Sequence, residues 1–134
     1  MEKLNERLAS CQAALATLDD AVRMSFSVIV RDASIQRFEY SFESLWKLLK
    51  GYLEQQEGIV CNSPKSCFRE ALLVGLLSAE ETEMCLAMTD DRNLTSHTYI
   101  ETLADTIYRN LPAYLAVMQK LLAQIHARLA SGNL

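Results

Sequence analysis

The stretch that decides the fold is residues 100–129, IETLADTIYRNLPAYLAVMQKLLAQIHARL. Its apolar side chains recur at steps of three and four residues, the spacing that places them on one face of an α-helix. These residues are Ile100, Leu103, Ile107, Leu111, Tyr114, Met118, Leu121, Ile125 and Leu129. Pro112 is expected to kink or divide the helix near Asn110 because proline cannot donate the backbone hydrogen bond. An apolar face of this length must pack against other helices.

Two further helices are expected before residue 60. Residues 2–23 carry one apolar seam with the same three- and four-residue steps, as in helices that pack against antiparallel neighbours. The second helix is expected from near Ser34 to Gly58, and its aromatic side chains indicate a central position. Within residues 24–30, Phe26, Val28 and Val30 alternate with serine and isoleucine, a pattern also compatible with a short strand. Because one isolated strand is not stable, we interpret them as a connecting loop.

Two shorter helices are marked by their first residues. Ser63 followed by Pro64 combines an N-cap with a proline at the first helical position,. Ser78 opens the next helix, where Glu81 completes a capping box,. The inner side chains of the third helix are expected to be Cys67, Ala71, Leu72, Val74, Leu76 and Leu77. The fourth helix is expected to bury Met84, Leu86 and Met88 and to end around residues 90–92.

Size and composition agree with a single helical domain. The chain has 134 residues with only 4 glycines and 2 prolines, few enough to fall at helix boundaries. We therefore predict an all-α, antiparallel up-and-down bundle of about five helices over residues 1–130, similar to a four-helix bundle, with a frayed tail at 131–134. Apolar side chains outside the main stripe, such as Tyr99, Tyr108 and Leu115, predict a partner subunit.

Charge and cysteine usage narrow the class of protein. A formal net charge of −4 argues against a generic nucleic-acid binder, although a small positive patch remains possible. The four cysteines lack a zinc-binding spacing and are expected to be free thiols in a reducing cytoplasm,. No leader peptide and no apolar window of about 20 residues is visible. The expectation is a cytoplasmic protein without a membrane segment.

Residues 92–99, Arg-Asn-Leu-Thr-Ser-His-Thr-Tyr, gather the polar chemistry of the chain. Thr98 and Glu101 have capping-box spacing, so a helix is expected to begin there with the cluster at its positive end. Exposed amides, a guanidinium and an imidazole together favour an anion, above all phosphate. In the alternative interpretation the hydroxyl and amide residues only form a turn, Arg92 is a solvated charge and His97 is incidental. Local physics leaves both interpretations open.

The functional interpretation gives each side chain a chemical task. Arg92 would bind phosphate through its planar guanidinium, His97 would act as acid or base, and the Tyr99 hydroxyl could accept a transferred group. This set suffices for metal-free RNA cleavage, and a symmetric dimer would supply two histidines for the two proton transfers.

Other chemistries lack their residues. The acidic pairs at 80–81 and 90–91 are interpreted as caps and solubilising charges, not as metal ligands. A glycine-rich phosphate loop, a Ser-His-Asp set and HExxH are missing,. We therefore expect no cofactor and no metal ion. His126 is expected to be a surface residue.

The cluster matches the Arg-x4-His-x-Tyr motif of the HEPN superfamily, which the chain resembles. More narrowly, the chain is similar to the nucleotidyltransferase substrate-binding proteins, the HepT-like members of that superfamily. Ile100 departs from the family pattern, in which an acidic residue often follows the tyrosine, and residues 84–85 depart where relatives often place tryptophan. The similarity extends beyond the motif to residues 37–43, 46–47, 50–54, 63–64, 69–71 and 107–108.

The resemblance implies a homodimeric helical bundle that pairs with a cognate minimal nucleotidyltransferase in a toxin–antitoxin-like module. It implies that Arg92 is the phosphate-binding cation with Asn93 beside it, His97 the acid or base, and Tyr99 the acceptor of AMP. Our leading hypothesis is a substrate-binding partner of the nucleotidyltransferase that presents a nucleotide or RNA phosphate at the motif. The alternative is a metal-independent endoribonuclease toxin that AMP transfer to Tyr99 inactivates.

Overall fold

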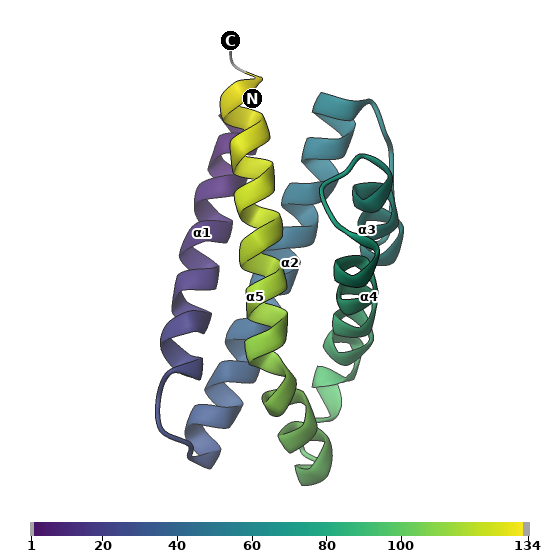
Figure 1. Ribbon diagram of the computed structural model, residues 1–134. Helices are drawn as coiled ribbons and strands as arrows, with labels where there is room; N and C mark the ends of the chain where they lie inside the picture. The colour runs from purple at the N-terminus through teal and green to yellow at the C-terminus, as the bar shows by residue number, and fades with distance from the viewer. Residues whose placement is uncertain (1, 133–134) are drawn as a thin grey trace.

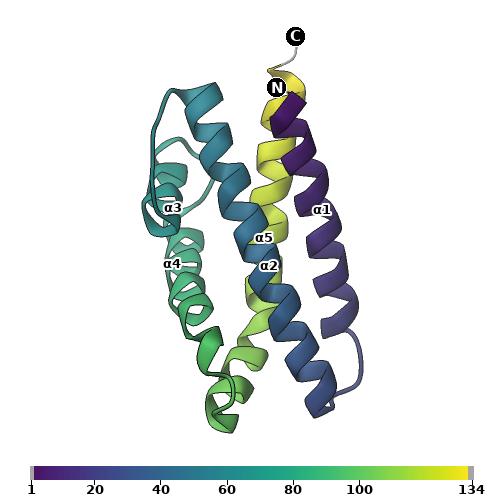
Figure 2. The same cartoon turned by 180° about the vertical axis from the view of Figure 1, so that it is seen from behind.

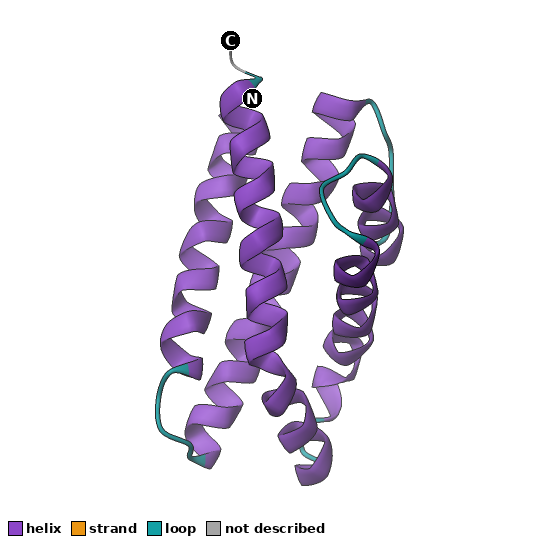
Figure 3. Ribbon diagram, in the orientation of Figure 1, coloured by secondary structure: helices purple, strands orange, loops and turns teal. Residues whose placement is uncertain are grey.

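Helices account for almost all of residues 2–132, the part of the chain that the computed structural model describes (Figure 1). No strand occurs among these residues, and loops join the helices (Figure 3). The predicted all-α bundle is confirmed. In order, the elements are α1 (Glu2–Val22), α2 (Val28–Glu57), α3 (Pro64–Leu73), α4 (Ala79–Leu94), the 3₁₀ helix η1 (Thr95–His97) and α5 (Glu101–Ser131).

The long helices alternate in direction, so α1 begins and α5 ends at the same end of the bundle (Figure 1). The turn between α4 and α5 lies at the opposite end. Helix α2 is central, as its aromatic content predicted, because it packs against α1, α3, α4 and α5. The Phe38 ring contacts Phe42 and stacks on Tyr114, with ring centroids 6.3 and 5.7 Å apart, and Phe42 contacts Phe68 at 6.0 Å. These rings join α2 to α3 and α5.

Helix α2 begins six residues earlier than expected, at Val28 instead of near Ser34. Ser27 is its N-cap, and the Ser27 hydroxyl accepts a hydrogen bond from the Val30 backbone N–H at 3.0 Å. The loop expected over residues 24–30 is therefore shorter. The apolar alternation was misleading because the first turn is held by its cap and not by burial, and Ile29 is 82% exposed. Gly58 ends the helix as predicted, with a left-handed φ of 69°,.

The expected starts of α3 and α4 are confirmed. Ser63 and Ser66 form a capping box around the first turn of α3, with Pro64 at the first helical position, and Ser78 and Glu81 form one at α4. Helix α3 ends at Leu73, and the turn after it uses Gly75 at a φ of 81°. Leu76 and Leu77 are buried in this turn, whereas Leu72 is exposed, contrary to the prediction.

The inner face of α4 also differs from the prediction. Met84 is 37% exposed and Leu86 is only partly buried, while Met88 is buried as expected. Thr82 and Thr89 face inward instead. They can do so because each hydroxyl donates to the backbone carbonyl four residues earlier, at 2.8 Å in both cases,. The helix continues to Leu94, past the expected end at 90–92.

Helix α5 stays one element through Pro112, so the proline does not divide it. Its axis bends along the part nearest α4 (Figure 1), as expected where a proline removes a backbone donor. Of the tail predicted at 131–134, Ser131 is the last residue of α5 and Gly132 caps it. Residues 133 and 134 lie outside the described part of the chain.

Cys61 and Cys67 form a disulfide, so the prediction of four free thiols is wrong. The turn at Ser63 and Pro64 reverses the chain and brings the two Cα atoms to 5.3 Å, within the range for a disulfide. Cys11 and Cys85 are free and buried. Burial raises the pKa of each thiol to about 12. Within residues 2–132 no helix is long and apolar enough to cross a membrane.

Candidate functional site

The motif residues lie where α4 passes through η1 into α5. Arg92 is in the last turn of α4, His97 ends η1, and Tyr99 lies in the turn before α5. Two threonine hydroxyl groups stabilise this tight turn. The Thr95 hydroxyl donates to the Arg92 carbonyl at 2.8 Å, and the Thr98 hydroxyl donates to the Thr95 carbonyl at 3.1 Å. The threonines therefore shape the turn, while the other polar side chains remain available.

Arg92 turns back toward α2 and is partly buried. Its guanidinium lies 3.3 Å from a Glu43 carboxylate oxygen and 3.9 Å from one of Glu39. It also donates to the Thr95 hydroxyl at 3.3 Å. Arg92 is thus not the solvated charge of the simpler interpretation. Two carboxylates neutralise it, and a phosphate that bound there would compete with them.

Arg92 lines a shallow hollow of about 400 Å³. The other lining residues are Gln36, Glu39, Tyr40 and Glu43 of α2. The Arg92 Nε atom is buried there without a hydrogen-bond partner among the described residues. One guanidinium nitrogen therefore remains unsatisfied, although the carboxylates pair with the two others.

His97 and Tyr99 do not line this hollow and are exposed to solvent. The His97 side chain is exposed, and 80% of Tyr99 is exposed. Their ring centroids lie 6.0 Å apart, edge to face. Within one chain the structure therefore brings His97 next to Tyr99, but neither residue lines the hollow that contains Arg92. Asn93 is also exposed.

The capping box expected between Thr98 and Glu101 does not form. Helix α5 begins at Glu101 after Ile100, which makes no side-chain cap. Thr98 has αR dihedrals of −72° and −2°, whereas an N-cap residue takes extended ones. The Glu101 carboxylate instead accepts charge-assisted bonds from Arg31, which are stronger than a bond to a backbone amide.

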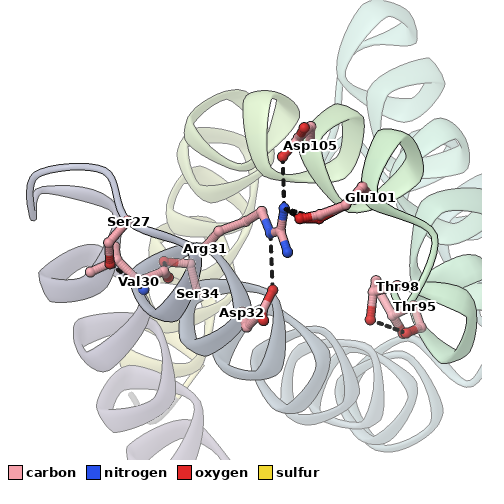
Figure 4. A network of polar contacts seen from close by, with 9 residues as sticks. All are labelled: Ser27, Val30, Arg31, Asp32, Ser34, Thr95, Thr98, Glu101 and Asp105. Carbon is pink, nitrogen blue, oxygen red and sulfur yellow. Dashed lines mark hydrogen bonds and ion pairs between the residues drawn. The ribbon is translucent and has the colours of Figure 1, made fainter.

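Arg31 is the functional-site neighbour that sequence reasoning missed. It is 4% exposed, and its Nη1 donates to both Glu101 oxygens at 3.0 Å and to Asp105 at 2.9 Å (Figure 4). Its Nε donates to Asp32 at 3.0 Å. The bonds to Glu101, then those to Asp105 and Asp32, raise the Arg31 pKa above its ordinary value. Arg31 thereby ties the start of α5, next to Tyr99, to α2.

A second polar contact fixes α4 against α5 at Asp91, the residue directly before Arg92. Tyr114 donates to an Asp91 carboxylate oxygen at 2.6 Å, and the Asn110 amide donates to the same oxygen at 3.2 Å. Burial and the bond to Asp91 raise the Tyr114 pKa. Asp91 thus joins helices instead of only solubilising the end of α4. Asp90 pairs with Lys65 of α3 at 2.6 Å.

Neither acidic pair forms a metal cluster. Glu81 caps α4 and pairs with Lys120. Across residues 2–132, no group of three or more His, Cys, Asp or Glu side chains is arranged to hold a metal ion. His126 is exposed, as expected, and lines a groove of about 370 Å³ between α1 and α5.

The chain matches known proteins over most of its length. The family model described as nucleotidyltransferase substrate binding protein like matches residues 6–127. A crystal structure from Thermus thermophilus is 47% identical, with a TM-score of 0.84 over 86% of this chain and 98% of that one. A Haemophilus influenzae structure, described as the fold of a substrate binding domain of a nucleotidyltransferase, is 28% identical, with a TM-score of 0.66 over 93% of this chain and 98% of that one.

A curated relative carries a description of activity. A Haemophilus influenzae protein described as a probable ribonuclease HepT is 33% identical over 99 residues. This match covers 71% of the chain and 66% of the relative, just under two thirds of the relative's length.

Proposed function

The chain belongs to the family of nucleotidyltransferase substrate-binding-like proteins, and we propose that it is the substrate-binding partner of a minimal nucleotidyltransferase. The pair would be a toxin–antitoxin-like module of the HEPN type. The observation that carries the proposal is the exposed Tyr99 beside His97, in a motif turn that lies inside the matched region. A hydroxyl at the end of the bundle can enter the active site of another protein without any helix moving.

Tyr99 is the proposed acceptor of AMP. Its hydroxyl oxygen would attack the α-phosphorus of ATP held by the nucleotidyltransferase. The bond to the β-phosphate oxygen breaks, pyrophosphate leaves, and the hydroxyl proton passes to solvent or to a base of the partner. The exposed Leu94 and Ile100 flank the turn and offer apolar area for the same contact.

A phosphate of nucleotide or RNA is the proposed ligand of Arg92, with Asn93 beside it and His97 as acid or base. Within one chain Arg92 faces Glu39 and Glu43 while His97 faces solvent. We therefore propose a homodimer whose twofold axis places His97 of one copy near Arg92 of the other.

Co-purification with the nucleotidyltransferase tests the pairing. A stable complex, together with a mass increase of one or more AMP units on Tyr99, is expected after co-expression with ATP available. Tyr99→Phe should abolish the increase, whereas Tyr108→Phe, a half-buried tyrosine on α5, should leave it intact. The pairing is wrong if no complex forms, and Tyr99 is not the acceptor if AMP is found on another residue.

The second candidate is a metal-independent endoribonuclease, which the description of the curated Haemophilus relative favours. Arg92 would hold the scissile phosphate, and His97 would transfer the protons. RNA should be cleaved in the presence of EDTA, and His97→Ala should remove the activity. His126→Ala is the matched control because it removes the chain's other histidine, which is also exposed. Equal cleavage by wild type and His97→Ala would exclude this role.

A further inference from the structure

A basic hollow of about 350 Å³ opens between α1 and α2. The two helices lie side by side along their length (Figure 2). The residues that line the hollow are Arg7, Trp46, Lys47, Lys50, Gly51 and Glu54. Its volume falls in the range of small-molecule sites.

Gly51 makes room for the Arg7 guanidinium in this hollow. It is a buried residue in the interior of α2, where glycine is less favourable than alanine,. A Cβ at this position would lie 3.0 Å from Arg7 Nη1 and 3.1 Å from Leu4 Cδ2. Without it, Arg7 of α1 lies against α2, and its Nη1 donates to the Lys47 carbonyl at 3.3 Å. This leaves other N–H groups of the planar guanidinium for a ligand.

The charge of the hollow is opposite to that of the chain. Three cations and one carboxylate, Glu54, line it, whereas the whole chain has a formal net charge of −4. Lys50 Nζ lies 5.9 Å from the centre of the Trp46 ring. Glu43 sits at the edge, where it accepts from Trp46 Nε1 at 3.1 Å and lies 4.0 Å from Lys47 Nζ.

We propose that this hollow, which shares no lining residue with the Arg92 hollow and meets it only through Glu43, is a nucleotide-binding site that binds the phosphate through Arg7, Lys47 and Lys50 and places the base against Trp46. Clustered cations bind phosphate through charge-assisted hydrogen bonds, and an indole ring is a stacking surface for any base. An acidic protein gains a local anion site only where its cations converge, and they converge here beside its single tryptophan. Free nucleotide and the phosphates of RNA share this chemistry.

Trp46 fluorescence reports binding directly because the chain has one tryptophan. Titration with AMP should give a saturable change in Trp46 fluorescence. Adenosine, which lacks the phosphate, and inorganic phosphate, which lacks the base, should each bind more weakly. Arg7→Gln and Lys50→Gln should each weaken AMP binding about tenfold, the effect of losing one charge-assisted bond. Gly51→Ala should also weaken it, by displacing the guanidinium without changing the charge.

Comparing AMP with a short oligoadenylate shows whether free nucleotide or RNA binds more tightly, and either order supports the site.

Two control variants make the test specific. Arg23→Gln removes a cation about 24 Å away along α1, where it pairs with Asp19, and AMP affinity should stay unchanged. His126→Ala, in the groove between α1 and α5, should also leave it unchanged, which ties the effect to this hollow. The proposal is overturned if AMP gives no saturable change, if adenosine or phosphate binds as tightly as AMP, or if Arg7→Gln, Lys50→Gln and Arg23→Gln have equal affinities.

Discussion

The connection between α2 and α3 and the connection between α4 and α5 are built in opposite ways. In the first, Ile59 N–H donates to the Leu53 carbonyl at 2.9 Å, Cys61 is bonded to Cys67, and Ser63 caps α3. In the second, the hydroxyls of Thr95 and Thr98 close the backbone path, but His97 and Tyr99 extend into solvent.

The comparison distinguishes a connection closed by its own bonds from one whose motif side chains stay exposed. The connection between α2 and α3 pairs its polar groups within itself, as expected where an unpaired buried backbone group would cost stability. The turn between α4 and α5 keeps its reactive side chains outside and is held from a distance by Arg31 of α2. Its position is fixed, while its imidazole and phenol remain exposed.

The largest effect is expected from opening the disulfide in the first connection. The Cys61→Ser and Cys67→Ser double variant should lower the free energy of unfolding by about 2 kcal/mol, the cost for a short loop. Urea unfolding measures this, and a reductant should destabilise the wild type but not the variant. Four titratable thiols in the unreduced, denatured wild type would contradict the disulfide.

Removing the cap of α3 should have a smaller effect. Ser63→Ala should cost about 1 kcal/mol because the Ser66 N–H loses its acceptor,. Thr98→Ala is the matched change in the second connection and should cost less, since Thr98 does not cap α5. Thermal unfolding measures the stability lost by each variant. Equal losses would mean that the Ser63 and Thr98 hydroxyls stabilise their two connections equally.

The start of α4 should show a modest dependence on pH. The hydrogen bond from Lys120, with the backbone bond from Ser78, lowers the pKa of Glu81 below its ordinary value of 4.5. The stabilisation is therefore complete above that value and is lost as the pH falls through the folded-state pKa. Glu81→Gln should lose less stability on acidification than the wild type. The exposed Glu80→Gln should behave as the wild type does, and identical acid sensitivity of all three proteins would refute the assignment.

The smallest effect on stability is expected at the exposed motif residues. Tyr99→Phe and His97→Ala should each change the free energy of unfolding by no more than about 0.5 kcal/mol, while they remove AMP transfer and RNA cleavage respectively. Calorimetry alongside the activity assays would show this separation. A large loss of stability in either variant would place these residues in the structural framework.

The sequence predicts the features of this fold that depend on local chemistry. The caps at Ser63 and Ser78 and the glycine at 58 mark helix ends because each satisfies backbone groups within a few residues,. The apolar stripe of α5 predicts its length, and its continuity through Pro112 shows that packing outweighs the lost backbone bond.

Interactions between distant residues explain what the sequence does not predict. Glu101 has the spacing of a capping residue, but its carboxylate goes to Arg31, 70 residues away. Arg92 is recognisable in the motif, whereas its pairing with Glu39 and Glu43 depends on how α4 meets α2. An acidic pair one helical turn apart, as at 101 and 105, is the signal that could have indicated a buried cation. The roles of Arg92, Asn93, His97 and Tyr99 stay predictions until the assays above are made.

Because α1 begins and α5 ends at the same end of the bundle, either terminus can carry an affinity tag or a fluorophore without approaching the motif turn. Helix α5 has 31 residues, so such a label would stay about 45 Å from Tyr99. The geometry suits energy-transfer measurements, in which a donor at a chain end and an acceptor on the proposed nucleotidyltransferase partner would report docking at the distal turn.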